Sequence, residues 1–285
     1  LAVNSNGVVA VAWSDARNGK DDIYLTVSKN GGRSFSKNRM VNDDPETPAH
    51  SHPSVAVDEK GAVYAAWEDF RFGNSDIFVA RSDDGGKSFS RNKKVNDDMG
   101  SSPQLSPSLM IGNDGRVLLV WGDFRNVNIT LGPPNAATGE ELRWAESRQG
   151  DADIYFSESL DGGVTFSKNI RLNDDGDRVA QAFPSLSVNR RGDVAVAWED
   201  FRNGDSDIYL TKRPAGGLFG PNQRVNDDPG GIEQYHPSLA LDSAGAAFVI
   251  WTDSRNNRFS EASSGQDDEG DDVFFAREGS TLAKR

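Results

Sequence analysis

Short apolar stretches separated by polar, glycine-containing turns recur along the whole chain. In one copy, residues 53–58 are followed by a turn at Gly61, an apolar run at 62–67, a second run at 76–80 and a short segment at 95–98. Runs this short, rich in valine, alanine and aromatic residues and bounded by glycine, predict β-strands rather than helices. The pattern therefore predicts a unit of four strands, named A to D in chain order and joined by tight turns.

Five tryptophans mark five copies of this unit. Each opens the pattern Trp-x-Asp-x-Arg, and successive tryptophans are 54, 54, 77 and 53 residues apart. A single four-stranded sheet cannot bury both of its faces, so neighbouring units must cover it, and repeated units of this kind are typical of propeller blades. The residues expected to serve this repeated structure are Trp13, Trp67, Trp121, Trp198, Trp251, Asp15, Asp69, Asp123, Asp200 and Asp253.

We therefore predict an all-β fold, a five-bladed β-propeller of four-stranded antiparallel blades. It is expected to form a single domain over residues 1–285, with repeats at approximately 1–52, 53–106, 107–183, 184–236 and 237–285. The first copy begins inside strand A, and the fifth shows no Val-Asn-Asp-Asp segment after its strand C. A six-bladed propeller, with one blade built from flanking sequence, is the alternative.

The turn between strands C and D carries a recognisable motif. Ser82–Phe89 and Ser159–Phe166 match the pattern S-x-D-x-G-x-[ST]-[FW], Ser28–Phe35 has asparagine in place of aspartate, and Arg213–Phe219 is a degenerate copy. This motif resembles the Asp box, or BNR repeat, of the sialidase-like β-propeller family, and the resemblance covers nearly the whole chain as architecture. In that family the Asp boxes are structural, so the resemblance implies the fold and does not by itself imply an activity.

The catalytic residues of sialidases do not follow from this resemblance. Those enzymes use an arginine triad, a Tyr–Glu nucleophile pair and an aspartate acid/base. The arginine of their early Arg-Ile-Pro motif has no match in this sequence. The repeat therefore implies a shared architecture and assigns no catalytic residue.

Charged residues concentrate on one face of the predicted propeller. In an antiparallel blade the B–C and D–A loops share a face, so the Asp-x-Arg pairs and the Asn-Asp-Asp runs should lie together. Arginine can contact an acidic or polyhydroxylated ligand with two parallel hydrogen bonds. We favour instead a ring of structural Asp–Arg pairs, because residues repeated in every blade usually serve the blade. The repeated arginines are ligand-binding candidates only on the first interpretation: Arg17, Arg71, Arg125, Arg202 and Arg255.

Two insertions interrupt the repeat on that face. The third copy is longer by 23 residues between Arg125 and Asp153, and it contains Glu141, Arg143 and Trp144. The fifth is longer by 12 residues, and its acidic run includes Asp267, Asp268 and Asp271, which are candidates for Ca²⁺ if they are not simply solvated. Long loops often bind ligands, so Arg143 and Trp144 join the ligand-binding candidates.

The loop before the fifth unit holds the remaining candidates. Glu233 beside Tyr235 suggests a nucleophile and base, with Glu141 as a further carboxylate, although surface polarity and packing explain the pair as well. His236 precedes Pro237 as His52 precedes Pro53, so both histidines occupy one repeat position. Packing or hydrogen bonding is the favoured role of these histidines over metal binding, and His236 remains a ligand-binding candidate.

Composition narrows the partners. The net charge of −13 disfavours nucleic acid and anionic membranes, cysteine is absent, and no apolar run has the roughly 20 residues that a membrane helix needs. We expect a secreted or cell-surface bacterial protein. The sequence assigns no cofactor with certainty, and Ca²⁺ is the one candidate.

The preferred function is a non-catalytic module that binds glycan or protein through the B–C/D–A loop face. The alternatives are a glycoside hydrolase acting on acidic extracellular glycans, and a surface-assembly component whose incomplete fifth blade receives a strand from a partner.

Overall fold

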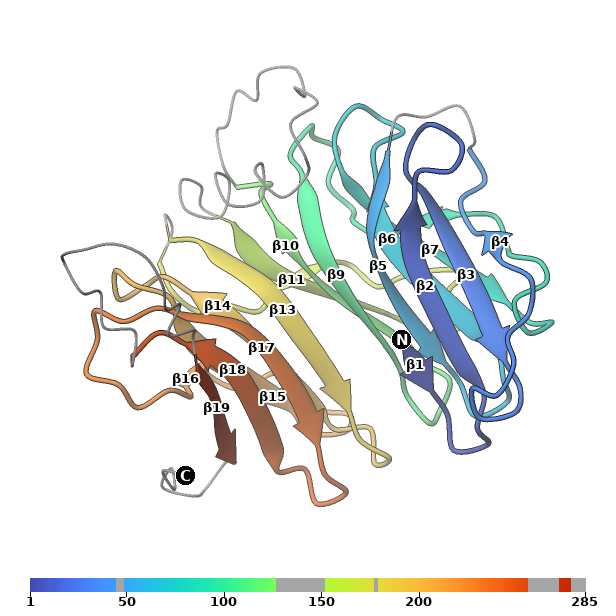
Figure 1. Ribbon diagram of the computed structural model, residues 1–285. Helices are drawn as coiled ribbons and strands as arrows, with labels where there is room; N and C mark the ends of the chain where they lie inside the picture. Colours follow the sequence, from blue (N-terminus) through green and yellow to red (C-terminus); the bar gives the residue numbers. More distant parts are fainter. Residues whose placement is uncertain (45–48, 127–151, 177–178, 256–271, 278–285) are drawn as a thin grey trace, which may run out of the picture.

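The chain folds into antiparallel β-sheets arranged side by side (Figure 1). The computed structural model describes residues 1–44, 49–126, 152–176, 179–255 and 272–277. Within these residues there are nineteen strands in five sheets, and no helix. Accordingly, no helix in the described part of the chain has the length and hydrophobicity needed to cross a membrane.

Each sheet contains strands that follow one another in sequence. We number the sheets as blades 1 to 5. Blade 1 consists of β1 (Ala2–Val3), β2 (Val9–Asp15), β3 (Asp22–Ser28) and β4 (Arg39–Met40), and blade 2 of β5 (His50–Val57), β6 (Val63–Asp69), β7 (Asp76–Ser82) and β8 (Lys93–Lys94). Blade 3 consists of β9 (Gln104–Ile111), β10 (Val117–Asp123), β11 (Asp153–Ser159) and β12 (Ile170–Arg171). Blade 4 consists of β13 (Gln181–Val188), β14 (Val194–Asp200), β15 (Asp207–Arg213) and β16 (Gln223–Arg224), and blade 5 of β17 (Gln234–Leu241), β18 (Ala247–Asp253) and β19 (Asp272–Arg277).

The predicted fold class is confirmed. All strand pairs are antiparallel, and four of the five blades have four strands. Among the described residues the fifth blade has three strands, since no fourth strand follows β19. The Asp-box turns close the C–D hairpins as local hydrogen-bonding units: Asp84 Oδ1 accepts bonds from Ser82 Oγ and from two backbone N–H groups, at 2.8–3.0 Å.

In blades 2 to 5, the tryptophan of strand B packs against the preceding blade. Trp67 packs with residues of blade 1, including Ile23 and Leu25. Trp121, Trp198 and Trp251 are buried in the same way against blades 2, 3 and 4. An indole buries roughly 150–250 Å² of surface, so these four side chains supply much of the apolar contact between blades.

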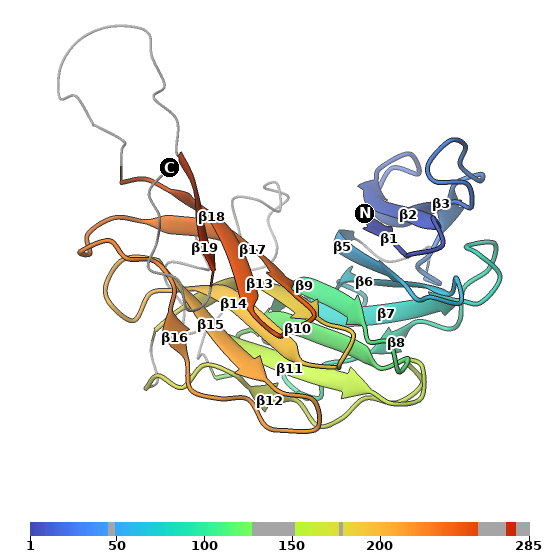
Figure 2. The same ribbon diagram turned by 90° about the horizontal axis from the view of Figure 1, so that it is seen from below.

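The five blades form an open arc rather than a closed ring. In Figure 2, blade 1 lies at one end of the arc and blade 5 at the other. Their strands make no substantial contact with each other, whereas each successive pair of blades does. Consequently Trp13, which has no preceding blade to pack against, is only partly buried.

This difference predicts unequal costs of removing two equivalent tryptophans. Trp121→Ala should lower the free energy of unfolding by about 3–5 kcal/mol, because it leaves a cavity between two blades. Trp13→Ala should cost clearly less, because the indole already faces solvent on one side. Chemical denaturation of the two variants, followed by circular dichroism, measures the difference. Equal losses would contradict the open arc.

Candidate functional site

A hollow of about 380 Å³ lies where the innermost strands of blades 2 to 5 meet. Strands β5, β9, β13 and β17 pack against one another in this order along the inner side of the arc. Each strand contributes a proline, three residues after its first residue, and the residue before that proline. The residues that line this axial pocket are His52, Pro53, Ser106, Pro107, Ser108, Phe183, Pro184, Ser185, His236 and Pro237.

The residue before each of these prolines has a strained backbone. His52, Ser106, Phe183 and His236 have φ angles of 50°, 57°, 50° and 50°, and they are the four non-glycine residues with positive φ in the described chain. Side chains larger than hydrogen rarely adopt this left-handed region, at a cost of roughly 1–2 kcal/mol per residue. The strands also shift register at these positions, for example between Ala182 and Ser185. Such β-bulges redirect a side chain, here toward the pocket.

Two buried glutamates accept hydrogen bonds from the strained residues of the pocket. Glu68 Oε1 accepts a bond from the backbone N–H of Ser106 at 2.7 Å, while its Oε2 lies 2.8 Å from Ser51 Oγ and 2.9 Å from His52 Nδ1. Glu199 Oε1 accepts a bond from the backbone N–H of His236 at 2.6 Å. Each glutamate follows the tryptophan of its own blade and accepts a hydrogen bond from the bulge of the next blade. Each therefore links two neighbouring blades.

The two glutamates differ in electrostatics. Burial, with the nearby charge of Glu233, raises the pKa of Glu199 to about 8, although the bond from His236 N–H opposes this shift. Glu199 is therefore a neutral acid at pH 7. Glu68, at the same repeat position, has the His52 imidazole and the Ser51 hydroxyl as additional partners. The pocket thus rests on one uncharged carboxyl group and on a second buried carboxyl group that has an imidazole and a hydroxyl as partners.

The lining itself is aromatic and hydroxylic. The rings of Phe183 and His236 meet edge to face, with centroids 5.2 Å apart, and Tyr235 lies 6.3 Å from His236. His236 is exposed, and Phe183 and His52 are partly exposed, so these rings are accessible from the pocket. Among the described residues, neither a carboxylate nor an arginine lines it.

The predicted pair Glu233 and Tyr235 is brought together, next to this pocket. The Tyr235 hydroxyl donates to the Glu233 carboxylate, and both side chains are partly buried at the start of β17. This position places them beside His236, the third candidate of the same loop. Neither is among the residues that line the pocket.

The repeated arginines join neighbouring blades. Arg125 Nε and Nη2 bond to Asp123 of its own blade, and its Nη1 bonds to Asp97 of the preceding blade at 2.6 Å. Asp97 Oδ2 accepts the backbone N–H of Asn169, and Asn169 Oδ1 accepts the N–H of Asp97. We call this arrangement the inter-blade clamp. Its arginine–aspartate pair recurs as Arg71–Asp43, Arg202–Asp174 and Arg255–Asp227.

The clamp leaves these four arginines little capacity for a ligand. Each guanidinium also lies over an aromatic ring of its own blade, at 4.1–4.2 Å from the ring centroid. The aspartate of each Trp-x-Asp-x-Arg motif additionally accepts the indole Nε1–H, at 2.8–3.0 Å. Within the described residues, Arg17 bonds to Asp15 alone, and its guanidinium lies over the ring of Tyr24.

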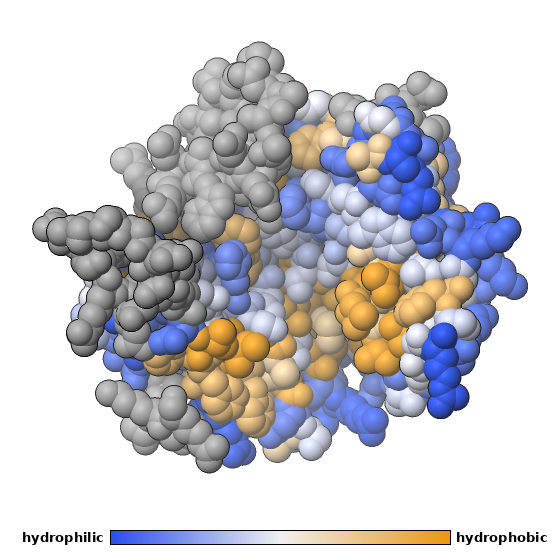
Figure 3. All heavy atoms as spheres, viewed as in Figure 1, coloured by the Kyte–Doolittle hydropathy of each residue, from blue (hydrophilic) through white to orange (hydrophobic). Residues whose placement is uncertain are grey.

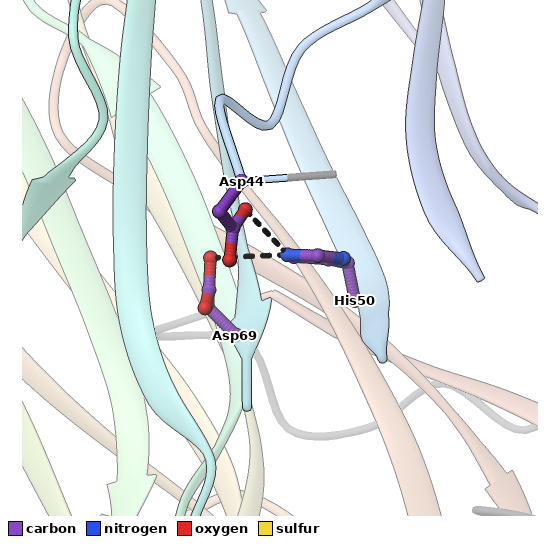
Figure 4. Close-up of side chains that lie close together, drawn as sticks. All are labelled: Asp44, His50 and Asp69. Carbon is purple, nitrogen blue, oxygen red and sulfur yellow. Dashed lines mark hydrogen bonds and ion pairs between the residues drawn. The ribbon is translucent and has the colours of Figure 1, made fainter. Parts of the chain in front are cut away.

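One cluster outside the pocket has the composition of a metal site. Asp44, His50 and Asp69 lie close together, with His50 Nε2 2.9 Å from Asp44 Oδ1 and 3.5 Å from Asp69 Oδ2 (Figure 4). However, the Arg71 guanidinium already donates to both aspartates. The position of His50 is held by Gln104, Gln181 and Gln234 in blades 3, 4 and 5, where the glutamine amide oxygen accepts a hydrogen bond from an asparagine side chain. His50 thus belongs to the structural network, and we assign no metal to the cluster.

Six predicted residues lie outside the described part of the chain. They are Glu141, Arg143, Trp144, Asp267, Asp268 and Asp271.

Sequence reasoning missed the buried glutamates and most of the pocket. The available signal was small: the residue before the repeated proline varies while the proline does not, and glutamate follows the tryptophan in two units only, at Glu68 and Glu199. Neither pattern indicates a positive φ angle or the convergence of four bulges on one hollow.

Glu199 should make stability depend on pH. Its pKa is about 8 in the folded chain and near its ordinary value when unfolded, so between pH 4.5 and 8 the folded state binds more protons. Stability should therefore fall as pH rises through this window, by on the order of a few kcal/mol. Glu199→Gln should remove this decline and stabilise the protein at pH 8, as measured by denaturation across the pH range.

Glu68→Gln is the matched control. It makes the same change at the same repeat position, but it weakens the hydrogen bonds to Ser51, His52 and Ser106. This variant should therefore lower the free energy of unfolding at pH 7. A Glu199→Gln variant that loses stability at pH 8 would contradict the neutral state of Glu199.

Comparison with known proteins identifies the fold. No family model matches the sequence, and no curated protein matches it. Among solved structures, an ulvan lyase from a new polysaccharide lyase family is 12% identical over 98% of this chain and 68% of that chain, with a TM-score of 0.62. A Penicillium chrysogenum α-L-arabinanase complexed with arabinobiose is 15% identical over 90% of this chain and 76% of that chain, with a TM-score of 0.57.

A Hadza microbial sialidase is 16% identical over 88% of this chain, with a TM-score of 0.53. The chain spans only about half of that sialidase, 52% of its length. At these identities the likeness establishes the fold: the chain is a β-propeller of the kind found in sialidases, arabinanases and polysaccharide lyases.

Proposed function

We propose that this propeller binds a carbohydrate in the axial pocket without hydrolysing it. The observation that carries the proposal is the lining of that pocket, in which a partly exposed phenyl ring and two imidazole rings lie next to serine hydroxyls on strained backbone. A sugar ring presents an apolar face and a rim of hydroxyl groups. Phe183 offers the matching apolar surface, and His52, Ser106 and His236 offer hydrogen-bonding groups.

The strain supports a role in binding. Four positive φ angles in one pocket cost several kcal/mol in total, by the per-residue estimate of roughly 1–2 kcal/mol. Strained backbone of this kind clusters at ligand sites, where it fixes side chains in position before the ligand arrives. The buried glutamates hold the strained N–H groups of Ser106 and His236 in place.

Two features argue against hydrolysis. A glycosidase needs two carboxyl groups facing the substrate, about 5–5.5 or 6.5–9.5 Å apart, whereas the described lining contains none. The arginines of blades 2 to 5 are also engaged with aspartates, so they are poor candidates for holding an acidic sugar. Arg17 alone among the five makes no bond to a second blade in the described chain.

A glycoside hydrolase is the second candidate, and two observations favour it. Glu199 is a neutral acid near pH 7, as a general acid must be, and Tyr235 is hydrogen-bonded to Glu233 beside the pocket. Catalysis would require Glu199, which is now buried beneath His236, to reach the substrate. Turnover of any glycan would favour this candidate.

The remaining assignments follow from the same proposal. We assign the chain to the Asp-box propellers, as a single domain that acts outside the cell or on its surface. The hydrogen bonds within the Ser82–Phe89 and Ser159–Phe166 turns support the Asp-box assignment. The ligands of the enzymes with a similar fold, arabinobiose among them, support a carbohydrate over a protein ligand.

Removing the phenyl ring tests the pocket. Phe183→Ala should weaken binding of glycans selected on an array of neutral and acidic oligosaccharides by at least about tenfold, as expected when a stacking ring is lost. Phe72→Ala is the matched control, because Phe72 is an exposed phenylalanine away from the pocket. Titration calorimetry measures both affinities. Equal affinities for the two variants would exclude the axial pocket as the site.

Phe183→Gly separates binding from folding. Glycine adopts positive φ freely, so this variant should be more stable than Phe183→Ala by about 1 kcal/mol while binding the glycan equally poorly. Denaturation and calorimetry on the same samples give both quantities. Restored binding in the glycine variant would show that the ring is not what the ligand contacts.

A further inference from the structure

The residue that follows the tryptophan of strand B is a glycine in blade 3. At this position blades 1, 2, 4 and 5 have Ser14, Glu68, Glu199 and Thr252. In blades 2 and 4 the glutamate side chain extends to the bulge of the next blade and accepts a backbone N–H there. Gly122 has no side chain to occupy the corresponding space between blades 3 and 4.

A small hollow of about 20 Å³ lies at this place and adjoins the axial pocket. We call it the side pocket. Ser106 and Phe183 line both pockets, and the other walls of the side pocket come from Leu105, Gly122, Phe124, Gln181 and Ala182. The inner side of the arc, which faces the viewer in Figure 3, is hollowed at its centre, with apolar and weakly polar surface in the hollow. One water-sized group needs roughly 10–15 Å³, so the side pocket has room for a single small group.

The backbone does not require a glycine at position 122. Gly122 lies in strand β10 opposite Leu105, and it is not one of the glycines with positive φ. The same bulge occurs beside Glu68, Glu199 and Thr252, so the bulge does not require glycine either. A Cβ atom on Gly122 would meet the Leu105 carbonyl oxygen at 3.7 Å, an ordinary contact distance. A strand glycine without a conformational reason often marks the close approach of a ligand.

Most of the side-pocket wall is apolar. Leu105, Phe124 and Ala182 contribute hydrocarbon surface, and Phe124 and Ala182 are buried. The amide of Gln181 is engaged elsewhere, because its oxygen accepts from Asn173 at 2.9 Å and its nitrogen donates to Asp175 at 3.0 Å. A hydroxyl or amide that entered would lose its bonds to water and find few partners, which is unfavourable. The side pocket therefore suits a group without polar atoms.

We propose that the side pocket receives the methyl group on C5 of a 6-deoxyhexose, while the ring of that sugar lies against Phe183. This inference rests on the proposed binding of a carbohydrate in the axial pocket, and it names the class of sugar. The methyl group is apolar, attached directly to the sugar ring, and small. A hydroxymethyl group adds a hydroxyl, a carboxylate adds a charge, and an acetamido group is larger and brings an N–H and a C=O that need partners.

Two series of methyl pyranosides test the ligand side of this proposal. The L-rhamnoside, L-mannoside and L-lyxoside share one ring configuration and carry a methyl group, a hydroxymethyl group or hydrogen on C5. The L-fucoside, L-galactoside and D-arabinoside form the second series. In at least one series the 6-deoxy sugar should bind about tenfold or more tightly than both of its relatives, because one carbon in an apolar pocket is worth about that factor. Titration calorimetry measures the affinities.

Gly122→Ala tests the protein side. Its methyl group fills the side pocket, so the affinity for the 6-deoxy sugar should fall about tenfold, while the affinity for the pentoside should stay unchanged. The matched control is Gly176→Ala, because Gly176 also lacks a positive φ, has open space around it and lines neither pocket. This control should keep the preference for the 6-deoxy sugar. Thermal unfolding followed by circular dichroism should show Gly122→Ala to be at least as stable as the parent chain.

Three results would overturn the side-pocket proposal. The first is that no 6-deoxy sugar binds, or that all members of each series bind equally. The second is a preference for the methyl group that persists in Gly122→Ala. The third is tighter binding of an N-acetylglucosamine glycoside that Gly122→Ala abolishes, since the side pocket would then take an acetamido group.

These failures differ from a failure of carbohydrate binding itself. If Phe183→Ala weakens the binding of some other glycan, the axial pocket remains the binding site and the class of sugar assigned here is wrong. If neither Phe183→Ala nor Gly122→Ala changes the affinity for any glycan, the proposed function fails together with this inference.

Discussion

The structure depends on burying an indole between two sheets while satisfying its N–H group. Trp67, Trp121, Trp198 and Trp251 are buried against the preceding blade, and each donates to the aspartate two residues later. That aspartate also accepts the arginine of the same motif, which in turn reaches the preceding blade. Apolar contact and ion pairing therefore meet at one point of each junction. An unpaired carboxylate there would be costly to bury, and this explains why the three residues recur together.

This coupling explains how much of the fold the sequence could predict. The spacing of tryptophans and glycines predicted the strands and the units, because these features repeat and depend on local chemistry. The axial pocket could not be predicted in this way. Phe183 and His236 are far apart in sequence, and they meet only because four bulges converge on the inner side of the arc. Convergence depends on the curvature of the arc, which no single unit specifies.

The sequence offered two interpretations of the face rich in carboxylates and arginines, a ligand funnel and the favoured ring of structural Asp–Arg pairs. In the structure the arginines of blades 2 to 5 bond to aspartates across the junctions. The carboxyl groups near the pocket lie one residue after a buried tryptophan. The sequence pattern predicts this position to be inside strand B and gives no sign of a binding site. Glu68 and Glu199 follow Trp67 and Trp198, whereas blades 1, 3 and 5 have Ser14, Gly122 and Thr252 there. The proposed binding site thus lies where the units differ, on a frame made by the residues that they share.

The clamps also explain how a strained pocket can persist. Left-handed backbone before proline would relax if the strand could shift in register, since the penalty of roughly 1–2 kcal/mol per residue favours any accessible alternative. Strands β5, β9, β13 and β17 cannot shift freely, because each pairs with a strand B whose tryptophan is packed against the preceding blade. In blades 2 and 4, the glutamate of strand B also bonds to the bulge of the next blade. Rigidity between blades therefore sustains strain at the axis. It follows that a blade left without its neighbour weakens the frame on which the pocket rests.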